Sequence, residues 1–181
     1  LLYVAMFFLV FEIFLTRGGD DFIPFLMCGK IPLLWYSKTL MRNANALVGG
    51  KGIMGQTDFP KHIFPYAGTL ESIYREMVVY GFLVVFMWGS GYVPNILWIY
   101  LVPIVLVMSL LILTSGLVVA FITAYVGDFR IILSMFTMGL MFMSGVFWDI
   151  RTLANQQTID NLLFYNPIAF LIDAHRQVLM H

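Results

Sequence analysis

Three ionisable side chains lie close together at the start of an apolar segment. Glu71, Arg75 and Glu76 fall within Leu70–Tyr80, whose sequence is LESIYREMVVY. Glu71 precedes Arg75 by four residues, which is the favourable order for an ion pair on one face of a helix. Charged side chains entering a membrane segment are costly and usually face each other or a cavity. The pattern predicts either an interfacial ion pair at a helix end or the polar lining of a transport path or subunit contact.

A second candidate is the segment Val48–Tyr66, in which prolines frame basic and aromatic residues. Such a segment either lies at a membrane interface or docks a partner, and the sequence leaves both possibilities open. The residues with the chemistry for docking are Lys51, Asp58, Phe59, Pro60, Lys61 and His62.

The same segment contains a glycine pattern, Gly50–Gly55, that formally fits G-x-G-x-x-G. The dinucleotide motif needs a strand before it and a helix after it, whereas this copy lies between two apolar segments. The phosphate-binding pattern G-x-x-x-x-G-K-[ST] does not occur in the sequence. We therefore predict that the chain holds no nucleotide and that any ATP it uses is bound by another protein.

Candidates for catalysis and metal binding are few. His62, His175 and His181 are far apart, and no H-E-x-x-H motif or Cys/His ligand spacing occurs. No serine has a base at a spacing that would nominate it as a nucleophile. We predict no catalytic residue and no metal site. The tryptophans and tyrosines fit belts at the membrane interface, with stacking on sugar rings as the alternative.

The C-terminal segment Asp149–His181 mixes apolar residues with charges. Asn166-Pro167 should break it into two short helices, because proline disfavours helix at the preceding residue. Neither piece is long enough to cross a membrane, so we expect interfacial or re-entrant helices. Asp173 and Arg176 are three residues apart and are predicted to pair. An interfacial amphipathic helix and a gate remain equal alternatives here.

The elements that position these residues are apolar. Between Met77 and Gly127 there are 51 residues without a charge, about 76 Å as one helix against a hydrocarbon core of about 30 Å. We therefore predict a membrane hairpin that turns at Gly89–Asn95. Only 11% of the chain is charged, against about 25% in soluble domains. Ten basic residues balance ten acidic ones, so the sequence predicts no nucleic-acid partner.

Five apolar segments can be placed, and because they do not alternate with polar residues they predict helices rather than a barrel. The loops on the side of Val48–His62 and Gly127–Arg130 are more basic, which places that side in the cytoplasm. The single cysteine, Cys28, is expected to be a buried thiol. The segments are Leu1–Leu15 (the end of a span), Phe22–Leu47, about Ile63–Trp88, Ile96–Tyr125 and Ile131–Trp148.

Short motifs follow these spans in a characteristic order: Gly29-x-Ile31-Pro32-x-x-x-Tyr36, Asn43/Asn45-x-Leu47, Asp58-Phe59-Pro60-x-x-Ile63-x-Pro65, Ile73-x-Arg75-Glu76, Gly127-Asp128-Phe129-Arg130, Ser144-Gly145-Val146-Phe147-Trp148, Tyr165-Asn166-Pro167 and Arg176. Over about Phe22–Met180 this order resembles the permease subunit of type-2 ATP-binding-cassette exporters. The branch that exports O-antigen, capsular polysaccharide or teichoic acid is the most similar, with a lean toward capsule or O-antigen.

The resemblance implies an all-α, polytopic fold: a single transmembrane permease domain over residues 1–181, with about five visible spans and a sixth after residue 181. It implies a multi-pass protein of the bacterial inner membrane. Its partners would be a second copy of the chain, two ATPase subunits that carry ATP and Mg²⁺, membrane lipid, and a polysaccharide or lipid-linked glycan. The chain itself would hold no cofactor.

The resemblance also implies two groups of functional residues. Val48–Tyr66 would couple to the ATPase through the six residues named above. The second group would line or gate the path, and its members are Glu71, Arg75, Glu76, Trp148, Tyr165, Asn166, Pro167 and Arg176. Two other classes of protein remain as alternatives: a membrane-embedded enzyme acting on lipid-linked glycans, and a scaffold that assembles other membrane proteins.

Overall fold

The computed structural model describes residues 22–49, 60–153 and 155–180, and every regular element within these residues is a helix. The predicted all-α fold is therefore confirmed for this part of the chain, while the span predicted at Leu1–Leu15 lies outside it. The elements are α2 (Phe22–Gly49), α4 (Ile63–Gly89), η2 (Ile96–Tyr100), α5 (Leu101–Tyr125), α6 (Phe129–Met143), η3 (Ile150–Thr152), α7 (Gln156–Tyr165) and α8 (Pro167–Met180).

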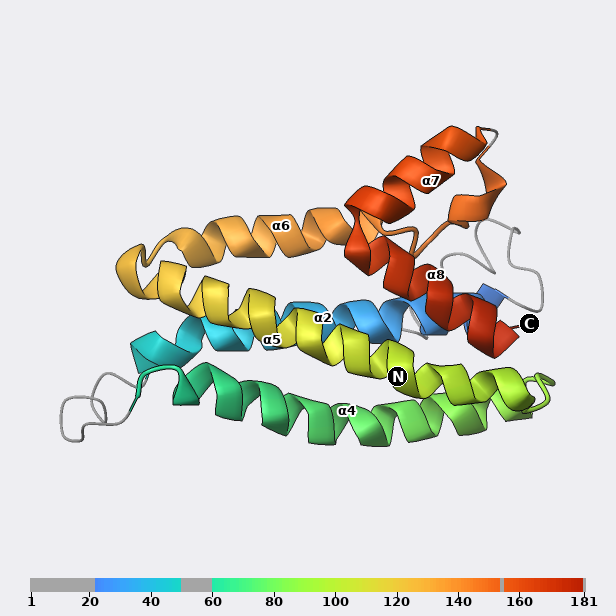
Figure 1. Cartoon of the computed structure of the whole chain (residues 1–181), viewed down its shortest axis with the longest axis horizontal. Helices are drawn as coiled ribbons and strands as arrows, with labels where there is room; N and C mark the ends of the chain where they lie inside the picture. The colour runs from blue at the N-terminus through green and yellow to red at the C-terminus, as the bar shows by residue number, and fades with distance from the viewer. Residues whose placement is uncertain (1–21, 50–59, 154, 181) are drawn as a thin grey trace.

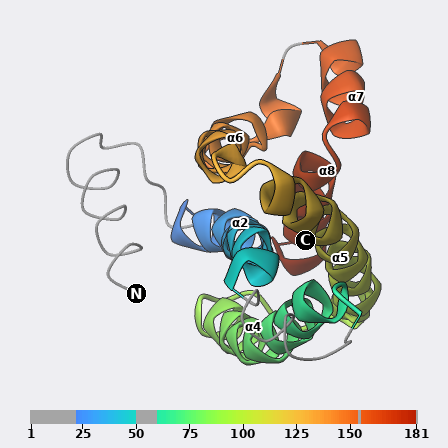
Figure 2. The same cartoon turned by 90° about the vertical axis from the view of Figure 1, so that its left-hand side faces the viewer.

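Helix α2 is the centre of the bundle. It packs against α4, α5, α6 and α8, which surround it when the bundle is viewed along its length (Figure 2). Fifteen of its 28 residues are buried, and these include the polar side chains of Thr39 and Asn43. Cys28 is also fully buried in this helix, as the sequence predicts.

Long helices that follow one another in the chain run antiparallel, so α2 and α5 point in the same direction (Figure 1). The residues before α4 and the α5–α6 connection lie at one end of the bundle, which we call the His62 end. The turn between α4 and η2 lies at the other, which we call the Gly91 end. Gly91 has φ +94°, a left-handed conformation that favours glycine, so the turn predicted at Gly89–Asn95 is confirmed.

Helices η2 and α5 form the continuous segment Ile96–Tyr125 that the sequence predicts as a span. Among the described residues it is the one helix that is both long and apolar enough to cross a membrane. Only six of the 25 residues of α5 are buried, and they form one stripe that faces the bundle. An apolar helix with so much exposed surface indicates a membrane protein.

Helix α6 differs from its prediction, because it ends at Met143 rather than continuing to Trp148. Gly145 has φ +68°, which ends the helix in the manner of a left-handed C-terminal cap. A Cβ added to Gly145 would also lie 2.5 Å from Ile150 Cγ1. The close approach of Ile150 therefore requires glycine, and the chain turns here instead of continuing the helix to Trp148.

Small residues allow the central helices to approach closely. The amide of fully buried Asn43 on α2 lies against Gly68 of α4 and Gly116 of α5, where an added Cβ would overlap with it. Its Nδ2 donates to the Thr69 hydroxyl at 2.8 Å, and that hydroxyl donates to the Pro65 carbonyl at 2.9 Å. Small residues and interhelical hydrogen bonds of this kind are typical of helix packing in membranes.

Candidate functional site

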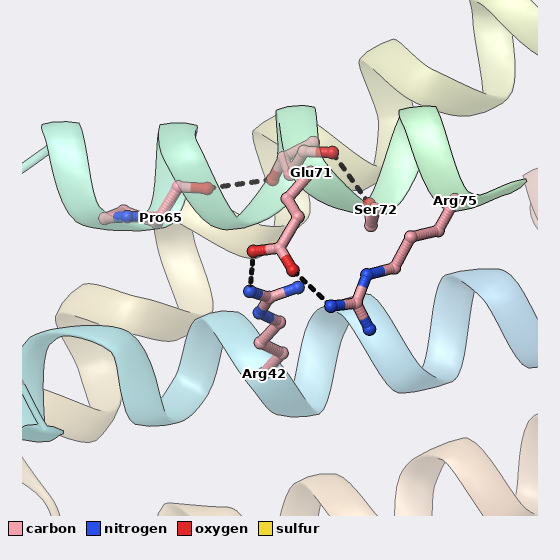
Figure 3. Close-up of polar contacts among 6 residues, drawn as sticks. Arg42, Pro65, Glu71, Ser72 and Arg75 are labelled. Carbon is pink, nitrogen blue, oxygen red and sulfur yellow. Dashed lines mark hydrogen bonds and ion pairs between the residues drawn. The ribbon is translucent and has the colours of Figure 1, made fainter.

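A charged face joins α2 to α4. Glu71 forms ion pairs with two arginines, Arg75 one turn along α4 (2.6 Å) and Arg42 on α2 (Figure 3). The predicted Glu71–Arg75 pair is thus confirmed, and Arg42 is a partner that the sequence analysis missed. About two fifths of the Arg42 and Glu71 side chains and three quarters of Arg75 are exposed, so the face is open rather than buried.

Two more charges extend this face along the bundle. Lys38 lies one turn before Arg42 on α2 and is exposed, and it attracts Glu76 electrostatically. Glu76 is the fourteenth of the 27 residues of α4, so it stands at the midpoint of that helix. The charged face therefore consists of Lys38, Arg42, Glu71, Arg75 and Glu76, and it reaches from near the His62 end to half-way along the bundle.

The backbone behind the charged face is held by a chain of polar contacts. Trp35 Nε1 donates to the Ser72 hydroxyl at 3.3 Å, and Ser72 donates to the Thr69 carbonyl at 2.7 Å. Both serine and threonine are buried, so their hydroxyls must find partners within the protein. These contacts fix the rotation of α4 on α2 and thereby set Glu71 opposite Arg42.

Half of the residues predicted to couple to an ATPase lie outside the described residues: Lys51, Asp58 and Phe59. The other three, Pro60, Lys61 and His62, are exposed in the turn that leads into α4. The ring of His62 packs edge-on against Tyr66, with 6.4 Å between ring centroids. A basic and aromatic surface is thus available at the His62 end, the same end of the bundle at which α6 begins (Figure 1).

The C-terminal segment forms a V of two short helices, α7 and α8, which turns back at Asn166-Pro167 (Figure 1). The predicted break is confirmed. Asn166 caps α8 by accepting from the backbone of Ile168 and Ala169, and its Nδ2 donates to the Ser144 hydroxyl at 3.3 Å. The apex of the V therefore rests on the end of α6.

The other residues predicted to line or gate the path in this segment lie in different environments. Tyr165 is exposed beside Phe164, with 5.3 Å between their ring centroids. Trp148 donates from Nε1 to the Phe142 carbonyl at 3.1 Å, which ties the loop to the last turn of α6. Pro167 is exposed as the first residue of α8, a position that suits proline because no helical partner is needed for its nitrogen.

Arg176 is buried and holds the V against α2. It donates to the carbonyls of Gly145 (2.6 Å) and Val146 (2.8 Å), and its guanidinium lies 3.6 Å from the centre of the Phe25 ring. Gly29 lies directly beneath it, where an added Cβ would come within 2.5 Å. Arg176 thus joins three segments that are distant in sequence, which is first of all a structural role.

The predicted Asp173–Arg176 pair is wrong. The Asp173 carboxylate instead accepts two hydrogen bonds from Arg151, at 3.1 Å from Nε and 2.8 Å from Nη2. These hydrogen bonds raise the pKa of the Arg151 guanidinium above its usual value. Three-residue spacing placed Asp173 near Arg176, but the loop after α6 brings backbone carbonyls to Arg176 and the Arg151 guanidinium to Asp173.

A buried histidine also fastens α8, and the sequence analysis missed it. His175 is fully buried, with Nδ1 2.7 Å from the Leu171 carbonyl and Nε2 2.8 Å from the Tyr80 hydroxyl. A carbonyl only accepts, so Nδ1 carries a proton and donates to Leu171. The hydrogen bond between Nε2 and the Tyr80 hydroxyl links α8 to α4 across 95 residues.

Comparison with known proteins finds a distant relative. The chain is 20% identical over 182 aligned positions to the O-antigen export system permease protein RfbA of Myxococcus xanthus, covering 98% of this chain and 68% of that protein. No protein-family model matches the chain. The similarity is distant but extends over nearly the whole chain, and it agrees with the resemblance that the order of the sequence motifs predicts.

Proposed function

We propose that the chain is the membrane-spanning subunit of an ATP-driven exporter that moves a polysaccharide, such as O-antigen or capsule in lipid-linked form, outward across the bacterial inner membrane. The observation that carries the proposal is the similarity to an O-antigen export permease over 98% of the chain. The similarity covers nearly the whole chain rather than one segment, and this supports a permease role for the chain as a whole.

The charged face supports a transport role. We propose that α4 also crosses the bilayer, and since it is 27 residues long, about 40 Å, its midpoint would then fall near the bilayer centre. Glu76 stands at that midpoint, and a charge facing lipid at this depth is strongly unfavourable. We infer that the charged face borders a water-filled path or a polar subunit contact, and that Glu71, Arg75 and Glu76 line it together with Lys38 and Arg42.

In this proposal the two ends of the bundle have separate tasks. The basic His62 end faces the cytoplasm, where two ATPase subunits bind partly through Lys51, Asp58, Phe59, Pro60, Lys61 and His62. The Gly91 end and the V of α7 and α8 face outward and close the path. A second copy of the chain completes the translocation path, and hydrolysis of ATP takes place on the partner subunits.

Identification of the companions of the full-length protein tests this function. The protein would be purified from its native membranes in mild detergent, and mass spectrometry would identify what co-elutes. We expect a stoichiometric companion that carries the phosphate-binding motif of an ATPase. Repeated absence of any ATPase, in a preparation that retains other membrane complexes, would instead favour a stand-alone enzyme for lipid-linked glycans or an assembly scaffold.

Charge reversal at the His62 end tests the coupling role separately. Lys51→Glu and Lys61→Glu should weaken both ATPase association and export, because the docking surface is basic. Asp160→Lys is a matched control for association, since it reverses an exposed charge in α7, away from the His62 end (Figure 1). Unchanged association in the lysine variants would remove these residues from the docking surface.

A further inference from the structure

An apolar cleft opens between α5 and α6, above α2. Its volume is about 520 Å³. Buried side chains form its floor and exposed ones form its walls. The floor includes Tyr36, Leu40, Val119 and Leu133, and the walls include Val118, Ile122, Ile132 and Phe136.

The few polar groups on the cleft already have partners. The Thr114 hydroxyl donates to the Leu110 carbonyl at 2.9 Å, and the Ser115 hydroxyl donates to the Leu111 carbonyl at 2.5 Å. Tyr36 forms a side-chain hydrogen bond with Ser115. With these groups satisfied, the lining has little to offer a polar ligand and favours a hydrocarbon chain.

A cation lies at the His62 end of the cleft. Arg130 follows Phe129, a lining residue, at the start of α6, and its side chain is exposed. Its Nη1 donates to Asn45 Oδ1 at 3.0 Å, so the side chain reaches across from α6 to α2. Its Nε donates to the Gly127 carbonyl at 3.1 Å. Both acceptors are uncharged, so the guanidinium keeps its positive charge for an anion.

We propose that this cleft binds an anionic phospholipid, with one acyl chain between α5 and α6 and the phosphate against Arg130. The proposal rests on an apolar cleft that has a cation at its end. The cleft complements the acyl chain of such a lipid, and the cation complements its phosphate. Basic pockets between membrane helices on the cytoplasmic side are a known setting for anionic headgroups. A second copy of the chain is the other occupant that could cover the apolar walls, and the variants below separate it from a lipid.

Native mass spectrometry of the full-length protein released from vesicles of phosphatidylcholine and phosphatidylglycerol tests the proposal. We expect the protein to retain phosphatidylglycerol in preference to phosphatidylcholine. Arg130→Gln should reduce that preference about fivefold, as expected for one cation near a headgroup. Arg130→Lys, which keeps a positive charge at the same position, is the matched control and should retain the preference.

A second pair of variants tests whether the cleft holds the acyl chain. Val118→Trp narrows the cleft and should abolish lipid retention, whereas Val107→Trp on the exposed face of α5 outside the cleft should not. Retention without headgroup preference, or retention unaffected by both Arg130→Gln and Val118→Trp, would overturn the proposal. A change of oligomeric mass in Val118→Trp with unchanged lipid would overturn it in favour of a second copy.

Discussion

Helices α2 and α5 pack against each other but differ in composition and in burial. Helix α2 carries Lys30, Lys38 and Arg42 within its 28 residues, and yet 15 of those residues are buried at the centre of the bundle. Helix α5 has no charge at all, and only six of its 25 residues are buried. In a soluble protein the more apolar helix would be the more buried one.

The reversal follows from the solvent. Lipid is as apolar as leucine, so apolar side chains gain little by leaving it, and polar side chains gather where other helices and water satisfy them. We infer that the exposed apolar side chains of α5 face lipid, while the polar side chains of α2 face its neighbours or the charged face. Substitutions that exchange these two environments should therefore impair the protein to different degrees.

The largest effect is expected at Arg176. Arg176→Met removes the donor to the Gly145 and Val146 carbonyls in a buried site, and should lower the free energy of unfolding by about 3 kcal/mol or more. Thermal unfolding of the purified protein in detergent would measure the change. Arg75→Met, at an exposed position, should change stability by about 0.5 kcal/mol or less. An export defect in Arg176→Met at unchanged thermal stability would show a gate rather than a clamp.

The second effect tests the lipid-facing side of α5. Leu110 lies near the middle of Ile96–Tyr125 and is exposed, so Leu110→Arg should make membrane insertion of this segment about 3 kcal/mol less favourable. A glycosylation-based insertion assay would measure the shift. Lys38→Leu on the charged face should leave insertion intact and lower export. Equal insertion of Leu110→Arg and the wild type would contradict a lipid-facing α5.

The third effect tests the close contact between the two helices. A methyl group at Gly116 overlaps with the Asn43 amide, so Gly116→Ala should force α5 away from α2 and cost about 1–3 kcal/mol of stability. Gly139→Ala on α6 is the matched control, because an added Cβ there meets open space. The control should be neutral or up to about 1 kcal/mol more stable, since alanine favours a helix. Similar melting temperatures for the two variants would argue against the contact.

The smallest effect concerns the ion pairs of the charged face. Glu71→Arg gathers three arginines on one surface and should impair export, and adding Arg42→Glu should recover part of the loss. The coupling should be small, because these side chains are exposed. The Glu71→Arg/Arg75→Glu exchange should recover less, since the introduced arginine would then stand beside Arg42. Full recovery by that exchange would show that Arg42 contributes nothing.

Local signals in the sequence predicted much of the fold. The turn at Gly91 and the break at Asn166-Pro167 were predicted because glycine and proline restrict the backbone wherever they occur. The end of α6 was not, because Gly145 lies within a continuous apolar run. The contact that excludes a Cβ at Gly145 comes from Ile150, which reaches it only after the chain has turned.

The site was less predictable than the fold. Glu71 and Arg75 are neighbours on one helix and could be paired by spacing, whereas Arg42 is 29 residues away and meets them only when α2 packs on α4. Arg176 donates to backbone carbonyls, and because every residue has a carbonyl, the sequence does not indicate which ones accept. His175 and Tyr80 are joined across 95 residues by two helices whose rotation is set by packing alone.

Thiol accessibility would show whether the charged face borders water while α5 borders lipid. In a Cys28→Ser background, single cysteines would be placed at Lys38 and Arg75 on the charged face, and at Val107 and Leu110 on α5. A membrane-impermeant maleimide needs water to reach a thiolate. We predict that the two charged-face cysteines react at least about tenfold faster than the two on α5. Equal reaction at all four positions, or reaction confined to α5, would contradict the account.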